Sequence, residues 1–330
     1  MNPLRGILYK ILAVTVFMGM ASLIKAASDQ VPSGQAVFFR SFFALPIIFG
    51  WLAMRHELQN GWKTSNPLGH FWRGLIGTSA MGLGFTGLGL LPLPEVTAIG
   101  YAAPLLVVVF AAMFLNEQVG VFRLSAVALG MVGALLVLSP RLPVGADIGA
   151  RDPLGAVVVL MSAVFAALAQ VFVRRLVATE DTAAIVFWFS ITSCVLSLLT
   201  IPWGWVWPTW DIALMLICAG LLGGIGQIFL TSSYRYADAS LVAPFDYISM
   251  ILALTIGYFL FDEVPTGTML IGACVVITAG VGIILRERHL GLERAQQRKV
   301  TQHRHIPAKI LIQQFVLGRR VNPLFTSNNM

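Results

Sequence analysis

The residues best suited to bind a small molecule are polar side chains set within or beside long apolar stretches of the chain. They are Lys25, Arg40, Tyr101, Gln170, Gln227, Asp246 and Tyr247. A charged group near the centre of a bilayer costs roughly 2.5–3.5 kcal/mol on insertion scales. Because such a cost is rarely carried without a role, we treat these residues as candidate substrate-binding groups.

Each charged or amide side chain also has a plainer interpretation. Asp246 lies a few residues inside its apolar stretch, where it can serve as a counter-charge or reach the membrane surface. Arg40 and Lys25 are candidates for substrate contacts or gate pairs, or anchors at the membrane interface. Gln170 and Gln227 can bind a ligand or a neighbouring helix.

Two pairs of residues repeat at one fixed spacing. Glu117 and Glu263 are 146 positions apart, and so are Tyr101 and Tyr247. This spacing indicates a duplicated unit. We expect the tyrosines to line the centre of the molecule or to pack in its core. We expect each Glu, which closes an apolar stretch, to be a gate or helix-end residue.

The chemistry that the sequence lacks is also informative. All five His fall in expected loops or the tail, at positions 56, 70, 289, 303 and 305. Asp246 has no second carboxylate beside it at depth, and the chain has no Gly-rich phosphate loop ending in Gly-Lys-Ser/Thr. The three Cys lie in apolar stretches, as hydrophobic filler does. We therefore expect no catalytic residues, no metal site, no cofactor and no enzymatic activity.

Composition predicts an all-α integral membrane protein. Hydrophobic residues make up 57% of the 330 positions and charged residues only 11%, against about 25% charged in soluble domains. Apolar stretches of bilayer-spanning length predict ten transmembrane helices, at 7–26, 36–54, 74–93, 96–115, 121–139, 153–173, 182–203, 212–234, 241–261 and 264–285.

The duplicated spacing groups these helices into two repeats of five. An odd number of spans inverts the second repeat relative to the first, as in many secondary transporters. We expect a first repeat at 1–139, a periplasmic linker at 140–152, a second repeat at 153–285 and a mostly disordered tail at 286–330. Glycines in the third and eighth spans, among them Gly220 and Gly224, favour close helix packing, and Pro104 predicts a kink.

Charge predicts the orientation. With both termini in the cytoplasm, the inner segments hold 18 of the 22 Lys and Arg, including Lys10, which can snorkel, and Arg73 in a loop. The first span otherwise resembles a signal peptide, but Lys25 argues against cleavage. The tail carries the whole net charge of +7, which favours anionic lipid rather than nucleic acid as its partner. The sequence leaves monomer or homodimer open.

The two halves resemble the ten-span EamA family of the drug/metabolite transporter superfamily. The resemblance rests on Phe71-Trp72-Arg73-Gly74, on the run from Leu90 to Pro104, on Phe114-Leu115-Asn116-Glu117, and on the stretch from Ala243 to Glu263. It covers about residues 5–285. It implies a secondary transporter in the bacterial inner membrane with a central cavity between its halves.

Residues 19–25 and 36–43 look most like members assigned to riboflavin uptake, which makes riboflavin the leading substrate. Two other substrates remain alternatives, with transport either into or out of the cell. S-adenosylmethionine is a cation and would favour Asp246 as its counter-charge. Amino acids would use Arg40 or Lys25 together with Asp246. A non-transporting membrane scaffold is the alternative from another class.

Overall fold

The structure is a computed structural model that describes residues 3–115, 125, 128–130, 132–133, 136, 152–237, 245–246, 248–279, 281–282 and 285–286. The chain divides into two compact units, Met1–Ile284 and Leu285–Met330. The helices described below all belong to the first unit. No strand occurs among the described residues, as the all-α prediction requires.

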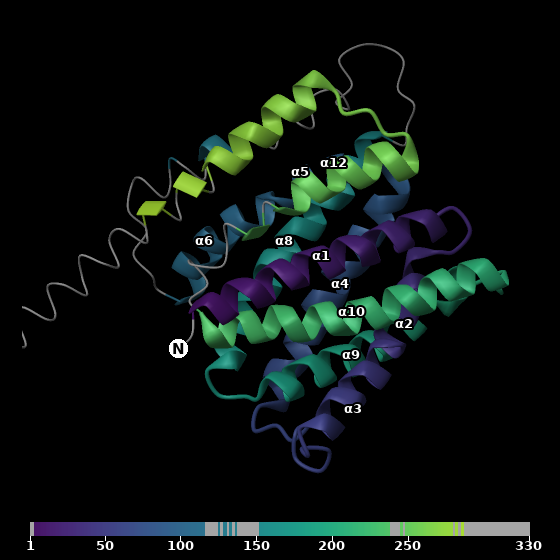
Figure 1. The fold of residues 1–330 in the computed structure, drawn as a ribbon, viewed down its shortest axis with the longest axis vertical. Helices are drawn as coiled ribbons and strands as arrows, with labels where there is room; N and C mark the ends of the chain where they lie inside the picture. The colour runs from purple at the N-terminus through teal and green to yellow at the C-terminus, as the bar shows by residue number, and fades with distance from the viewer. Residues whose placement is uncertain are drawn as a thin grey trace, which may run out of the picture. The chain divides into compact units, whose positions relative to one another are not determined.

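The described helices follow the apolar stretches of the sequence, and Figure 1 labels all of them except η2. They are α1 (Pro3–Ala27), α2 (Ser33–Phe42), α3 (Ala44–Met54), α4 (Pro67–Leu90), α5 (Leu93–Gly100), α6 (Ala102–Leu115), α8 (Asp152–Val177), α9 (Thr182–Leu198), the short 3₁₀ helix η2 (Ile201–Trp203), α10 (Trp210–Tyr236) and α12 (Ile248–Phe261).

Four of the described helices are long and apolar enough to cross a membrane: Leu4–Ala27, Ser33–Met54, Pro153–Val177 and Trp210–Tyr236. Shorter apolar helices cover Leu93–Val107, Thr182–Leu198, Ile248–Phe261 and Gly267–Ala279. Most of the expected span at 121–139 lies outside the described residues. The count of ten helices and the inverted repeat therefore stay predictions.

Two of the expected spans are each divided into two helices. The break at Phe43 separates α2 from α3, and the break at Tyr101 separates α5 from α6. A proline follows three residues after each break, at Pro46 and Pro104. Proline lacks the amide hydrogen that would bond one turn back, and its ring clashes there. Where the sequence predicts a kink from Pro104, the structure interrupts the helix at Tyr101.

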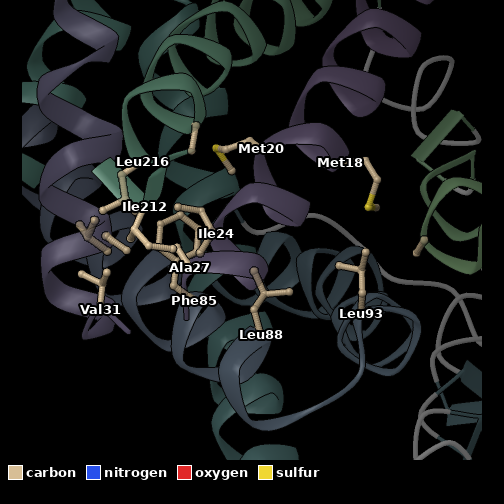
Figure 2. Packing of buried hydrophobic residues seen from close by; sticks show 14 residues of the cluster. Met18, Met20, Ile24, Ala27, Val31, Phe85, Leu88, Leu93, Ile212 and Leu216 are labelled. Carbon is tan, nitrogen blue, oxygen red and sulfur yellow. The ribbon is translucent and has the colours of Figure 1, made fainter. Parts of the chain in front are cut away.

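Helix α1 is central to the packing. It runs alongside α10 and also contacts α12 and α4 (Figure 1). Figure 2 shows Ile24 of α1 among Phe85 of α4 and Ile212 and Leu216 of α10, within one buried apolar cluster. Ile24 is 1% exposed and Leu216 is 0% exposed. Helix α1 therefore joins elements from both halves of the chain.

Helix α10 approaches α2 and α3 closely because two of its residues lack side chains. A Cβ at Gly220 would lie 2.8 Å from the Phe39 carbonyl oxygen. A Cβ at Gly224 would lie 3.0 Å from Ala44 Cα and 3.1 Å from its carbonyl oxygen. Packing, rather than room for a ligand, accounts for both glycines.

A polar contact outside the membrane-length helices ties the loop after α8 to the start of α4. One carboxylate oxygen of Glu180 accepts hydrogen bonds from the Ser65 hydroxyl at 2.7 Å and from the Ser65 and Asn66 amides at 3.0 and 3.1 Å. The other lies 3.5 Å from His70 Nε2. Burial alone would raise the pKa of Glu180, but the hydrogen bonds from Ser65, together with the nearby His70 side chain, hold it below its ordinary value.

Replacing Gly224 with alanine tests the close approach. A methyl group in a tight helix contact costs about 1–3 kcal/mol, which exceeds the gain in helix propensity of about 1 kcal/mol over glycine. We expect Gly224→Ala to lower the thermal unfolding temperature of the purified protein. Gly82 is the matched control, because a Cβ there meets nothing within 4 Å. Gly82→Ala should leave stability unchanged or raise it, and equal effects of the two changes would contradict the packing.

Candidate functional site

A cavity of about 370 Å³ lies among α1, α2, α4, α5, α8, α9 and α10. Its polar wall consists of Arg40, Arg73, Thr97, Ser162, Gln170, Gln227, Thr231 and Tyr234. Its apolar wall includes three aromatic rings, those of Phe17, Phe85 and Phe189. A mostly apolar wall with a few polar groups is typical of a small-molecule site, and the volume falls in the usual range.

The two arginines of this wall meet at one aromatic ring. The Arg73 guanidinium carbon lies 3.9 Å from the centroid of the Phe189 ring, and that of Arg40 lies 5.3 Å from the same centroid. Arg40 is 2% exposed and Arg73 is 6% exposed. Attraction between a desolvated cation and an aromatic face contributes up to about 2 kcal/mol. Phe189 therefore holds both charges near each other, but it does not neutralise them.

The hydrogen-bonding capacity of these arginines is largely unused among the described residues. Arg40 Nη2 donates to the Gly223 carbonyl oxygen at 3.3 Å and to Gln227 Oε1 at 3.4 Å. The Nε and Nη1 atoms of Arg40 are buried without a hydrogen-bond partner, and so are those of Arg73. A buried donor left without a partner costs about 1–3 kcal/mol, and more when it is charged.

Two glycines leave space for the guanidinium groups. A Cβ at Gly77 would collide with Arg73 Nη1, and a Cβ at Gly223 would lie 2.8 Å from Arg40 Nε. Gly77 lies one turn after Arg73 on α4, and Gly223 lies on α10 opposite Arg40. The glycine-rich helices therefore accommodate the arginine side chains as well as pack closely.

An ion pair joins α1 to Asp246, which lies just before α12. Lys10 Nζ lies 2.8 Å from Asp246 Oδ1 and 3.5 Å from the hydroxyl of Tyr234, which lines the cavity. Lys10 is 2% exposed. The expectation that Lys10 snorkels to the headgroups is therefore wrong, because its ammonium group is buried against the half-buried Asp246 carboxylate.

A second ion pair joins the other end of α1 to the residues after α12. Lys25 Nζ lies 2.9 Å from Glu263 Oε1 and donates to the carbonyl oxygens of Leu88 and Leu91 at 3.2 and 3.0 Å. Glu263 Oε2 accepts from the Leu93 amide at 2.9 Å. This pair therefore connects the end of α1, the turn between α4 and α5, and the end of α12.

The structure separates the predicted site residues into groups. Arg40, Gln170 and Gln227 line the cavity. Lys25, Asp246 and Glu263 form the ion pairs instead, and none of them is part of the cavity wall. Tyr247 and Glu117 lie outside the described residues.

Tyr101 lies in a core cluster rather than on the cavity wall. It is 5% exposed, and its hydroxyl is 2.7 Å from Ser249 Oγ and 3.4 Å from the Asp246 carbonyl oxygen. Its contacts link the break between α5 and α6 to the start of α12. A direct substrate contact by Tyr101 stays a prediction.

Sequence reasoning missed Arg73 as a site residue. Both Arg73 and His70 were assigned to a loop before the third apolar stretch, but α4 begins at Pro67 and both side chains are buried. His70, at 2% exposed, contacts Glu180 rather than solvent. The available signal was Asn66-Pro67, a helix start in which the Asn66 side chain accepts from the Gly69 amide at 2.9 Å.

A larger hollow of about 750 Å³ lies among α1, α3, α9 and α10 and includes Arg55 and Arg235 in its wall. Both are exposed, and both have an acidic partner: Arg55 pairs with Glu57 at 3.0 Å, and Arg235 pairs with Asp181 at 3.3 Å. We therefore regard the smaller cavity, with its buried arginines, as the candidate site.

Membrane-length helices around a cavity with polar groups are typical of a multi-pass membrane protein, and the cavity is its candidate site for a small molecule. The chain belongs to the EamA-like transporter family, whose model matches residues 4–139 and 153–286. Proteins of this family are transporters rather than enzymes, and the chain is accordingly a multi-pass protein of the bacterial inner membrane.

Curated relatives cover most of the chain. A pseudopaline exporter, CntI of Pseudomonas aeruginosa, is 30% identical and is aligned over 84% of this chain and 95% of its own length. An S-adenosylmethionine uptake transporter of Rickettsia felis is 26% identical over 86% of this chain and 94% of its own. A riboflavin transporter of Rhizobium johnstonii is 28% identical over 78% of this chain and 82% of its own length.

Neutralising Asp246 tests the pairing with Lys10. Asp246→Asn leaves a buried ammonium group without its carboxylate. Breaking a fully buried pair costs about 3–5 kcal/mol, and we expect a smaller loss here because the Asp246 side chain is 32% exposed. We expect a lower unfolding temperature for Asp246→Asn, most of which is recovered when Lys10→Met is added. The matched control is Glu57→Gln, because the pair between Glu57 and Arg55 is exposed and contributes about 0–1 kcal/mol. A double variant no more stable than Asp246→Asn would contradict the pairing.

Proposed function

We propose that the chain is a secondary transporter that moves a small metabolite across the inner membrane by alternating access through the 370 Å³ cavity. The observation that carries this proposal is the position of the cavity relative to the two ion pairs. Lys10 and Lys25 are fifteen residues apart on α1, which corresponds to about 22 Å along a helix. Phe17, between them, lines the cavity.

Both ion pairs bind α1 to residues that flank α12. Breaking the pair at one end while the other persists would open the cavity toward one side of the membrane. Alternating access requires this property, in which one part moves relative to another around a fixed site. By the charge distribution of the sequence, we assign the pair between Lys25 and Glu263 to the outer side.

Riboflavin is supported as a substrate by the relatives named as riboflavin transporters, at 28% and 26% identity. Its flat ring is suited to the aromatic residues Phe17, Phe85 and Phe189. Gln170 and Gln227 offer donors and acceptors for its ring edge or its hydroxyl groups.

The relatives named for S-adenosylmethionine uptake support a second substrate. A cationic substrate would benefit from a carboxylate in the cavity, yet no Asp or Glu occurs among the described residues that form the wall. Asp246, expected to supply that charge, bonds to Lys10. Amino acids require the same acidic partner and meet the same difficulty. The relatives are named as exporters and as uptake transporters, so they favour neither direction.

Thiol labelling of the cavity tests alternating access. The reporter is Thr97→Cys, in a background in which Cys194, Cys218 and Cys274 are replaced by alanine. Thr97 lines the cavity, and its hydroxyl donates a hydrogen bond to the Leu93 carbonyl oxygen of its own helix. We expect Glu263→Gln to speed labelling by an impermeant maleimide from outside intact cells. Loss of about 1–2 kcal/mol from the closed state raises the open population by a factor of roughly 5–30.

Glu57→Gln is the control for that experiment, because it removes an exposed carboxylate outside the cavity. Its labelling rate should equal that of the reporter alone. If the thiol at position 97 reacts at the same rate with and without Glu263→Gln, the ion pair between Lys25 and Glu263 is not a gate.

Riboflavin transport is tested by expressing the chain in a riboflavin auxotroph that lacks an importer. Growth at low external riboflavin would assign riboflavin to the cavity if Phe189→Ala loses this growth and Trp207→Ala keeps it. Phe189 lines the cavity, and Trp207 is the control because its side chain is 99% exposed. Failure to grow, with the protein detected in the membrane, would remove riboflavin as an imported substrate while leaving the transport mechanism to the labelling experiment.

A further inference from the structure

The cationic groups inside this protein are of two kinds. Lys10 and Lys25 each have a carboxylate within 3 Å, at 2.8 and 2.9 Å. Arg40 and Arg73, which form part of the cavity wall, have none among the described residues. The described part of the cavity therefore carries two positive charges and no negative one.

The arginines are also not satisfied as hydrogen-bond donors. Their Nε and Nη1 atoms are buried and have no hydrogen-bond partner in the described part of the chain, and each residue is more than nine-tenths buried. Among the described residues, Arg40 alone of the two bonds to protein oxygens, and both of its bonds are long, at 3.3 and 3.4 Å. Burying a charged guanidinium group without a hydrogen-bond acceptor costs free energy unless another group binds it.

Resting on the transport function proposed above, we propose that the substrate is an organic anion whose carboxylate or phosphate group binds Arg40 and Arg73. The planar guanidinium matches both of these anionic groups and forms two parallel, charge-assisted hydrogen bonds with either. Phe189, in contact with both guanidiniums, keeps them together in one place. The substrate group that binds the two arginines is therefore an anion, either a planar carboxylate or a tetrahedral phosphate.

The rest of the wall indicates the body of that molecule. Phe17, Phe85, Leu88 and Val96 supply an apolar surface on the α1, α4 and α5 side of the cavity. A molecule with an anionic group at one end and an apolar or aromatic body satisfies both parts of the wall. Among flavins, this criterion favours a 5′-phosphate over neutral riboflavin.

Binding to the purified full chain tests the substrate class directly. The probes are phenylacetate, phenyl phosphate and phenylacetamide, which share a ring and differ in charge. We expect the two acids to raise the unfolding temperature at millimolar concentration. The amide should bind at least about tenfold more weakly, because it cannot form charge-assisted bonds with the arginines. The acid that binds more tightly identifies carboxylate or phosphate as the preferred group.

Arg73→Met should abolish the response to both acids without lowering the unfolding temperature of the unliganded protein, because it removes a charge that has no counter-charge. Arg55→Met is the control, since Arg55 is exposed and pairs with Glu57. If Arg73→Met does not elute as a single species, Gly77→Ala decides: it keeps both arginines but displaces Arg73 Nη1, and it should weaken the response to the acids.

The proposal is overturned if the amide binds as well as the acids, if neither acid stabilises the protein, or if the response persists in Arg73→Met. Uptake of riboflavin and riboflavin 5′-phosphate into proteoliposomes separates the two proposals. Equal uptake that is insensitive to Arg73→Met would end the anion proposal and keep transport. Acid binding without movement of any probe, including both phenyl acids, would end transport and keep the anion site.

Discussion

A charge that is removed from water is costly unless a partner binds it, and the lysines of this protein meet that cost with ion pairs that position its helices. Lys10 and Lys25 lie near the two ends of α1, and both bind carboxylates that flank α12. These two contacts position α1 against α12, while apolar packing holds α1 against α10 (Figure 1). Helix α1 is therefore fixed at its ends by charge and along its length by hydrophobic contact.

The sequence predicted what depends on local composition. Apolar stretches located the helices, Pro104 predicted the break near Tyr101, and Gly220 and Gly224 predicted a close helix contact. It did not predict the break at Phe43, although Pro46 offered the same signal. Local rules of backbone geometry and side-chain size govern these features, so a single sequence contains the information for them.

The sequence did not predict which charges would meet. Lys10 and Asp246 are far apart in the chain, and nothing local indicates that their side chains pair. Arg73 was missed for a different reason: the helix begins before the apolar stretch does, at Pro67, so a residue assigned to a loop is buried. The matched spacing of Tyr101 and Tyr247 indicated duplication, yet the Tyr101 hydroxyl bonds near α12 and does not face the cavity. Position within a repeat does not by itself determine a role.

The difference between lysine and arginine suits the two tasks proposed for the cationic groups. A lysine is a compact charge on a flexible chain, so it can release one carboxylate as helices move and pair again afterwards. An arginine is a rigid fork that matches a planar or tetrahedral anion in one orientation. In the proposed mechanism, the lysines of α1 occupy positions where contacts form and break. The arginines of α2 and α4 occupy the wall of the cavity. The two proposals thus assign substrate binding to the arginines and movement to the lysines, and the apolar side chains of α1 between its two ion pairs, Phe17 among them, connect the two.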